Sequence, residues 1–181
     1  SDSPEPYSFR VLRTFPHDPD AFTQGLLYHE GFLYESTGGW GTSSIRRVDL
    51  ETGRVLDRRN LPRHFFGEGL ALWENRLIQL TWRSGTGFIY DLKTLDMIRR
   101  FHYSGEGWGL TQDLDGLIMS DGSSELRRLN PRTLRELNRL TVHDRGLPLA
   151  GLNELEYIDG EIWANVFPTK RIVRIDPAAG N

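Results

Sequence analysis

The sequence predicts an all-β protein of the β-propeller class, and three observations lead to this prediction. One segment recurs four times along the 181 residues, each copy carries a hairpin turn in its middle, and no stretch has the pattern of a capped amphipathic helix. A repeat of about 40–45 residues built from short strands is typical of propeller blades. An irregular β-sandwich is the alternative, and the constant register of the repeat argues against it.

The repeated segment aligns without gaps in all four copies. The copies are QGLLYHEGFLYESTG from Gln24, EGLALWENRLIQLTW from Glu68, WGLTQDLDGLIMSDG from Trp108 and NELEYIDGEIWANVF from Asn153. Each copy predicts a strand, a tight turn and a second strand. The expected turns are Glu30-Gly31, Glu74-Asn75, Asp115-Gly116 and Asp159-Gly160.

A third strand is expected after every hairpin, and a fourth after the first three. The third strands are RRVDLETG, FIYDLKTL, LRRLNPRTL and IVRIDPAAG, and the fourth strands are RVLDRRNL, MIRRFHY and RELNRLTVH. Residues 10–18, RVLRTFPHD, resemble the fourth strands but precede the first hairpin. An orphan outer strand is expected where both termini close the last blade, so the chain reads as a propeller whose final blade is missing.

The expected domain organisation is simple. Residues 1–8 are polar and contain proline, and we expect a disordered lead-in there, typical of what remains after a signal peptide is removed. Residues 9–181 are expected to form one propeller domain of about four blades plus the N-terminal closing strand.

Composition excludes several classes of function. The 22 Lys and Arg nearly balance the 25 Asp and Glu, and no long run of like charges occurs, so we expect no nucleic-acid partner. No apolar run is long enough for a membrane-spanning helix, so no membrane partner is expected. Cysteine is absent, and the five His have no metal-binding spacing, so no metal site and no cofactor are expected.

The first column of the repeat predicts a site. Equivalent positions in a propeller lie at the same radius and height, so these four residues are expected to face one another near one mouth of the channel: Gln24, Glu68, Trp108 and Asn153. The last column contains Gly38, Trp82, Gly122 and Phe167. Together the columns predict a small pocket with one carboxylate, two carboxamides and an aromatic wall.

Other candidate residues are given no role in this pocket. Glu106 and Glu154 are expected to alternate away from it, and Asp121 fits a turn. Trp40, Trp73 and Trp163 fit packing in the core or at the rim. The column offers one carboxylate, whereas a sugar-lactone hydrolase on a propeller would need a cluster of them around an axial metal.

Several strings resemble the glutamine cyclotransferases of the plant and bacterial type, similar to the papaya latex enzyme. They are FTQGL, ESTGGWGTSSIR, FGEGL, LTWRSGTGFIYD, GEGWGLTQD, SDGSS and LNELEYIDGEIWANVF, and the similarity covers essentially all of residues 9–177. The resemblance implies a five-bladed, secreted or periplasmic propeller, monomeric when complete. It also implies a metal-independent acyltransferase that converts the N-terminal Gln of peptides and proteins to pyroglutamate with release of ammonia.

Carried over by motif, the resemblance makes Glu68 the catalytic carboxylate. The substrate-binding residues that it implies are Phe22, Gln24, Trp82, Trp108 and Asn153, with Phe167 where the family usually has a second Trp. We expect Glu68 to move a proton between the two substrate nitrogens. The alternative is a non-catalytic propeller that binds peptide N termini or another small polar ligand at the same mouth.

Overall fold

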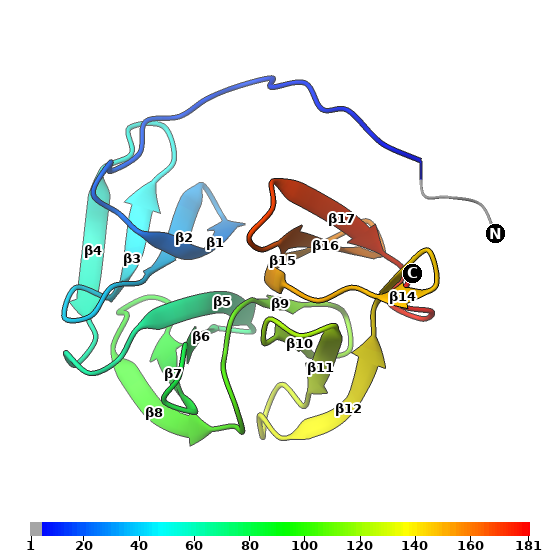
Figure 1. Cartoon of the computed structure of the whole chain (residues 1–181). Coiled ribbons are helices and arrows are strands. Elements are labelled where there is room, and N and C mark those ends of the chain that lie inside the picture. Colours follow the sequence, from blue (N-terminus) through cyan, green and yellow to red (C-terminus); the bar gives the residue numbers. More distant parts are fainter. Residues whose placement is uncertain (1–4) are drawn as a thin grey trace.

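The computed structural model describes residues 5–181 and consists of four antiparallel sheets, or blades, arranged around one axis (Figure 1). Blade 1 contains β1 (Thr23–His29), β2 (Phe32–Thr37), β3 (Ser44–Asp49) and β4 (Val55–Asn60). Blade 2 contains β5 (Gly67–Trp73), β6 (Arg76–Thr81), β7 (Thr86–Asp91) and β8 (Met97–His102).

Blade 3 contains β9 (Leu110–Gln112), β10 (Leu117–Ser120), β11 (Glu125–Leu129) and β12 (Glu136–Thr141). Blade 4 has three strands: β15 (Leu152–Ile158), β16 (Glu161–Val166) and β17 (Arg171–Ile175). In every blade the strands pair in chain order. The predicted all-β propeller is confirmed with four blades, and every predicted third and fourth strand is present.

The hydrophobic core lies between successive blades. One cluster joins blades 1 and 2 around Ile45 and Phe88, a second joins blades 2 and 3 around Leu80 and Met119, and a third joins blades 3 and 4 around Leu126. Their side chains alternate along the strands, because successive residues of a strand point to opposite faces. The outer strands β8 and β12 are mostly exposed. Each blade therefore buries its apolar faces against its neighbours.

The predicted hairpin turns form at three of the four positions. Glu30, Gly31, Asp159 and Gly160 all have positive φ, as two-residue hairpin turns require. The turn expected at Asp115-Gly116 is instead a longer loop, because β9 ends at Gln112 and β10 begins at Leu117. The Oδ1 atom of Asp113 accepts hydrogen bonds from the Asp115 N–H at 2.9 Å and the Gly116 N–H at 3.0 Å. The side chain thus replaces the left-handed backbone of the other turns.

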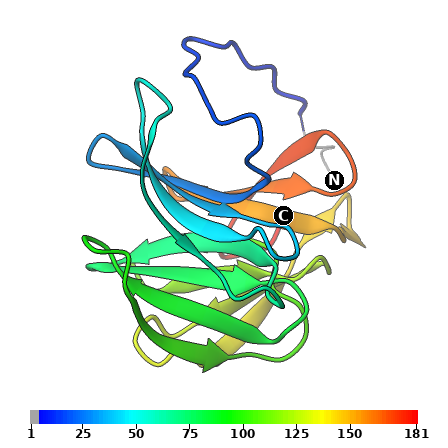
Figure 2. The same cartoon turned by 90° about the vertical axis from the view of Figure 1, so that its left-hand side faces the viewer.

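The N-terminal segment runs along the outside of the ring without pairing to a strand (Figures 1 and 2). Arg46 of β3 donates to Asp18 at 2.7 Å, and His17 lies 2.9 Å from Glu35 of β2. The predicted lead-in falls partly on residues 1–4, which lie outside the described residues, and residues 5–8 are exposed and irregular. Residues 10–18, predicted as an outer strand, have no strand partner among residues 5–181.

Two further findings concern the described residues as a whole. A short hairpin that the sequence did not predict, β13 (His143–Asp144) with β14 (Leu147–Pro148), connects blades 3 and 4. Within residues 5–181 there is no helix long and apolar enough to cross a membrane.

Candidate active site

The first repeat column lies at the start of the four inner strands, which surround the axis (Figure 1). Gln24 is in β1, Glu68 in β5 and Asn153 in β15, whereas Trp108 comes two residues before β9. The Gly69 N–H donates to the Trp108 carbonyl at 2.7 Å. Ser120 connects the next pair, since its hydroxyl donates to the Asn153 carbonyl at 2.6 Å. The structure therefore brings together the column positions of blades 2 and 3, and those of blades 3 and 4.

Glycine permits this close approach of neighbouring inner strands. The residue after each of the first three column positions is Gly25, Gly69 or Gly109. A Cβ atom on Gly109 would lie 2.0 Å from the Asn153 carbonyl oxygen, and one on Gly69 would lie 2.5 Å from the Leu110 nitrogen. Any side chain would push two strands apart, so these glycines set the separation of the site residues.

Glu68 is the buried carboxyl group of the site. Glu68 is only 7% exposed. Burial, and after it the nearby charge of Glu106, raise the pKa of Glu68 from 4.5 to about 8. A carboxyl group with a pKa close to the working pH can both donate and accept a proton, as general acid–base chemistry requires.

Glu106 lies in the site, so the prediction that it alternates away was wrong. Its Oε2 atom accepts hydrogen bonds from the Trp82 Nε1–H at 2.9 Å and from the Trp108 Nε1–H at 2.8 Å. Arg83 Nε lies 3.5 Å from Glu106 Oε1. The physical reason is the period of two in extended backbone, which puts Glu106 on the same face as Trp108. The other excluded residue, Glu154, packs against the backbone of Leu26, and burial raises its pKa to about 9.

Aromatic side chains gather beside Glu106. The aromatic rim consists of six residues that contact one another or share Glu106: Phe22, Trp40, Phe66, Trp82, Trp108 and Phe167. On one side of the aromatic rim, Phe66 lies between two other rings. Its centroid is 5.5 Å from that of Trp82 and 5.9 Å from that of Phe22. On the other side, Phe167 meets Trp108 edge to face at 5.7 Å.

The aromatic rim is more open than the predicted pocket, and it contains a residue that the prediction lacked. Phe22, Trp40 and Phe167 are each more than half exposed, at 59%, 57% and 58%. Phe66 was missed, although it stands two residues before Glu68, where Phe22 stands relative to Gln24. The two glycines of the last column do leave room: Gly38 faces the Phe66 ring, and Gly122 faces the indole of Trp108.

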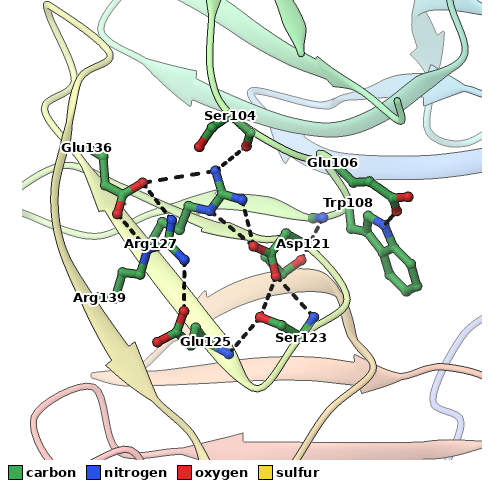
Figure 3. Close-up of polar contacts among 11 residues, drawn as sticks. Ser104, Glu106, Trp108, Asp121, Ser123, Glu125, Arg127, Glu136 and Arg139 are labelled. Atoms are coloured by element: carbon green, nitrogen blue, oxygen red, sulfur yellow. Dashed lines mark hydrogen bonds and ion pairs between the residues drawn. The ribbon is translucent and has the colours of Figure 1, made fainter. Parts of the chain in front are cut away.

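A buried ion pair supports the loop that carries Glu106 and Trp108 (Figure 3). Arg127 of β11 pairs with Asp121 at 2.7 Å and donates to the Ser104 carbonyl at 2.6 Å. Asp121 also accepts a hydrogen bond from the Ser123 N–H at 3.0 Å, so its predicted role in a turn is confirmed. Charge-assisted hydrogen bonds of this kind hold a loop more firmly than neutral ones.

No group of acidic or histidine side chains suited to a metal ion occurs within residues 5–181. The described site offers one buried carboxyl with a raised pKa, Glu68, together with neighbouring carboxamides and an aromatic surface. Gln24 and Asn153 place their carboxamides in the same column as Glu68, and the indoles can pack on the aliphatic part of a small polar ligand.

Comparison with known proteins decides the family. The profile described as glutamine cyclotransferase matches residues 1–181. The chain belongs to the glutamine cyclotransferase family. It is 47% identical over 173 residues to the glutaminyl-peptide cyclotransferase of Arabidopsis thaliana. That alignment covers 94% of the chain and 54% of the Arabidopsis protein, so the chain spans about half the length of this curated relative.

Solved structures agree with the family and the fold. The crystal structure of Myxococcus xanthus glutaminyl cyclase superimposes with a TM-score of 0.88 at 37% identity, covering 94% of this chain and 72% of that one. The Pan2 WD40 domain of Neurospora crassa superimposes with a TM-score of 0.62 at 9% identity, covering 84% of this chain and 46% of that one. The second likeness reflects the propeller fold alone.

Proposed function

We propose that this chain carries the acid–base centre of a glutaminyl-peptide cyclotransferase, which converts an N-terminal Gln to pyroglutamate with release of ammonia. The observation that carries the proposal is Glu68, a buried carboxyl with a pKa of about 8 beside an aromatic rim. The 47% identity to the Arabidopsis glutaminyl-peptide cyclotransferase supports it. The substrates are peptides or proteins that begin with Gln.

The reaction forms one carbon–nitrogen bond and breaks another. The α-amine attacks the side-chain carboxamide carbon, a proton leaves the attacking nitrogen, and the carboxamide nitrogen departs as ammonia after gaining a proton. Glu68 can perform both transfers, because both nitrogens belong to the same residue. Gln24 and Asn153 can donate hydrogen bonds to the oxygen that becomes negative. The site also holds the substrate's Gln side chain folded toward its own α-amine, and this positioning supplies much of the remaining acceleration.

The pH dependence follows from these groups. The reactive complex has one proton shared between Glu68 and the substrate amine, whose ordinary pKa is about 7.7–8.0. When Glu68 and the amine are both protonated, the amine is not a nucleophile. When both have lost their protons, the leaving nitrogen has no proton donor. Because the pKa of Glu68 is also about 8, kcat/KM should form a bell with its maximum near pH 8.

The proposal is tested by ammonia release from a Gln-initiated peptide, followed by mass spectrometry. We expect conversion well above the spontaneous rate, and no conversion of the same peptide with an acetylated α-amine, which cannot attack. Exhaustive chelation should leave the rate unchanged, since the mechanism uses a carboxyl. A protein that binds the free peptide without accelerating ammonia loss would instead be a non-catalytic binder. Loss of activity on chelation, with recovery only on adding zinc, would contradict the carboxyl mechanism.

We infer further that the ring of the parent protein has five blades. Blade 4 has three strands where the others have four, and residues 10–18 run unpaired along the outside. A fifth blade would pair with that segment and cover the edges that now face solvent. Exposed sheet edges favour association, so light scattering should show the 181 residues self-associating as concentration rises. A chain that stays monomeric and is as active as a longer natural form would contradict the inference.

A further inference from the structure

We propose that Glu106 is a positioning residue of the site, which fixes Trp82 and Trp108 relative to each other by accepting both indole N–H groups on one carboxylate oxygen. The role in turnover rests on the proposed cyclisation, whereas the geometry stands by itself. No part of the repeat pattern marks Glu106, because blades 1, 2 and 4 have Phe22, Phe66 and Gly151 at its position.

The geometry of Glu106 joins two blades. Trp82 follows β6 of blade 2, and Trp108 precedes β9 of blade 3. Their Nε1 atoms lie 2.9 and 2.8 Å from the same oxygen, Glu106 Oε2. One shared acceptor limits the distance between the two indole nitrogens and the tilt of both rings, which two separate acceptors would not do.

Both the carboxylate and its loop are themselves held. Arg83 lies beside Glu106 Oε1 at 3.5 Å, and its guanidinium stacks over the Trp82 ring at 3.8 Å. The Gly107 N–H donates to the Trp82 carbonyl at 3.0 Å, so the backbone next to Glu106 is also attached to blade 2. Arg127 holds the start of the same loop through Ser104 (Figure 3). Contacts within the protein are therefore enough to hold Glu106 in position.

The consequence for a ligand concerns the aromatic rim. Trp82 packs on Phe66, and Trp108 packs on Phe167, so each indole supports one side of the rim. Without Glu106, both indole N–H groups lose a charged acceptor, and the rings are free to choose other rotamers. A bound N-terminal Gln would then be held less tightly in the folded conformation that cyclises.

The charge of Glu106 also faces Glu68. Tyr103 faces Glu68 too, but burial raises the pKa of Tyr103 to about 12, so it stays neutral at the working pH. Arg83 partly offsets the charge of Glu106. Replacing Glu106 by a neutral residue should therefore make Glu68 ionise at lower pH and move the pH–rate bell toward acid.

Two variants separate the hydrogen bonds from the charge. Glu106→Gln keeps a side-chain carbonyl that can accept both indole N–H groups but removes the charge, whereas Glu106→Ala removes both. The matched control is Glu161→Gln, which removes a carboxylate paired with Arg174 at 2.8 Å on blade 4. The readouts are kcat, KM, the pH–rate profile, peptide affinity and the two indole N–H resonances in NMR spectra, assigned with Trp82→Phe and Trp108→Phe.

We expect Glu106→Ala to lower kcat/KM by about 10- to 100-fold, the range for losing hydrogen bonds to a charged group. Both indole resonances should move upfield and exchange faster with solvent. Glu106→Gln should lower kcat/KM less than Glu106→Ala, keep both resonances protected, and shift the maximum of the pH–rate bell toward acid. The control should leave all readouts unchanged.

The proposal is overturned if Glu106→Ala leaves the indole resonances in place and kcat/KM within about threefold of the unsubstituted protein. It is also overturned if Glu106→Gln behaves like Glu106→Ala in every readout and the maximum of the bell does not move in either variant. A longer natural form that shows no turnover at all would contradict the proposed cyclisation. In that event peptide affinity and the indole resonances still decide the role of Glu106.

Discussion

Replacing Glu68 by Gln is expected to lower kcat by about 10²–10⁴-fold, the usual contribution of general acid–base assistance. Gln has nearly the shape of Glu and can form hydrogen bonds, but it cannot carry a proton at neutral pH. The carboxyl is buried with a raised pKa, so the neutral replacement resembles the protonated form and the fold should survive. Steady-state ammonia release gives kcat, and calorimetry gives the affinity for a Gln-initiated peptide.

The matched control is Glu74→Gln in the turn at the far end of β5. Glu74 is exposed and pairs with Arg132 at 3.2 Å, so activity should not change. Affinity for the peptide should stay within about tenfold in Glu68→Gln, because the aromatic rim is intact. Turnover of Glu68→Gln within about threefold of the unsubstituted protein would remove Glu68 as the proton carrier.

Replacing Gly109 by Ala is expected to have the second-largest effect, through the separation of blades 3 and 4. The added Cβ would lie 2.0 Å from the Asn153 carbonyl oxygen, and backbone cannot swing aside as a flexible side chain does. Overpacking of this kind costs typically about 1–3 kcal/mol of unfolding free energy. A displacement of about 1 Å between Glu68 and Asn153 can lower activity on the order of 10²-fold. Thermal unfolding and ammonia release measure the two effects.

Gly160→Ala is the control for this prediction. Gly160 lies in the β15–β16 turn with φ of 88° and nothing within 4 Å of an added Cβ. Ala is strained at this φ, so stability should fall here too, but the site should keep its geometry and its activity. If Gly109→Ala were as active as Gly160→Ala at equal stability, the close approach of β9 and β15 would not set the site.

The repeat made the fold predictable, because every blade repeats an inner hairpin and a third strand, and the first three blades add a fourth. It also predicted which column faces the axis, since Gln24, Glu68 and Asn153 all lie at the start of inner strands. Their catalytic and binding roles remain predictions. Side-chain contacts between blades could not be predicted in the same way, because they depend on the distance between neighbouring strands of different blades.

Glu106 and Phe66 illustrate what the sequence leaves open. Both lie two residues before a column residue, and the period of extended backbone puts them on the same face. The opposite case is Asp113, whose side chain closes the third hairpin turn in place of a two-residue turn. The spacing of two places Glu106 beside the site, but it does not indicate the two indole donors.

The titration of Glu68 is the most direct test of its role as proton carrier. With ¹³C-labelled Glu, its carboxyl resonance is assigned by its loss in Glu68→Gln and followed across pH. We expect a midpoint near 8 instead of the ordinary 4.5. Because the folded state then holds a proton that the unfolded state loses, this group's stabilising contribution is full below about pH 4.5 and is lost as pH rises through about 8. A midpoint near 4.5, with Glu68 ionised throughout the active pH range, would contradict a buried, protonated Glu68 as the acid of the reaction.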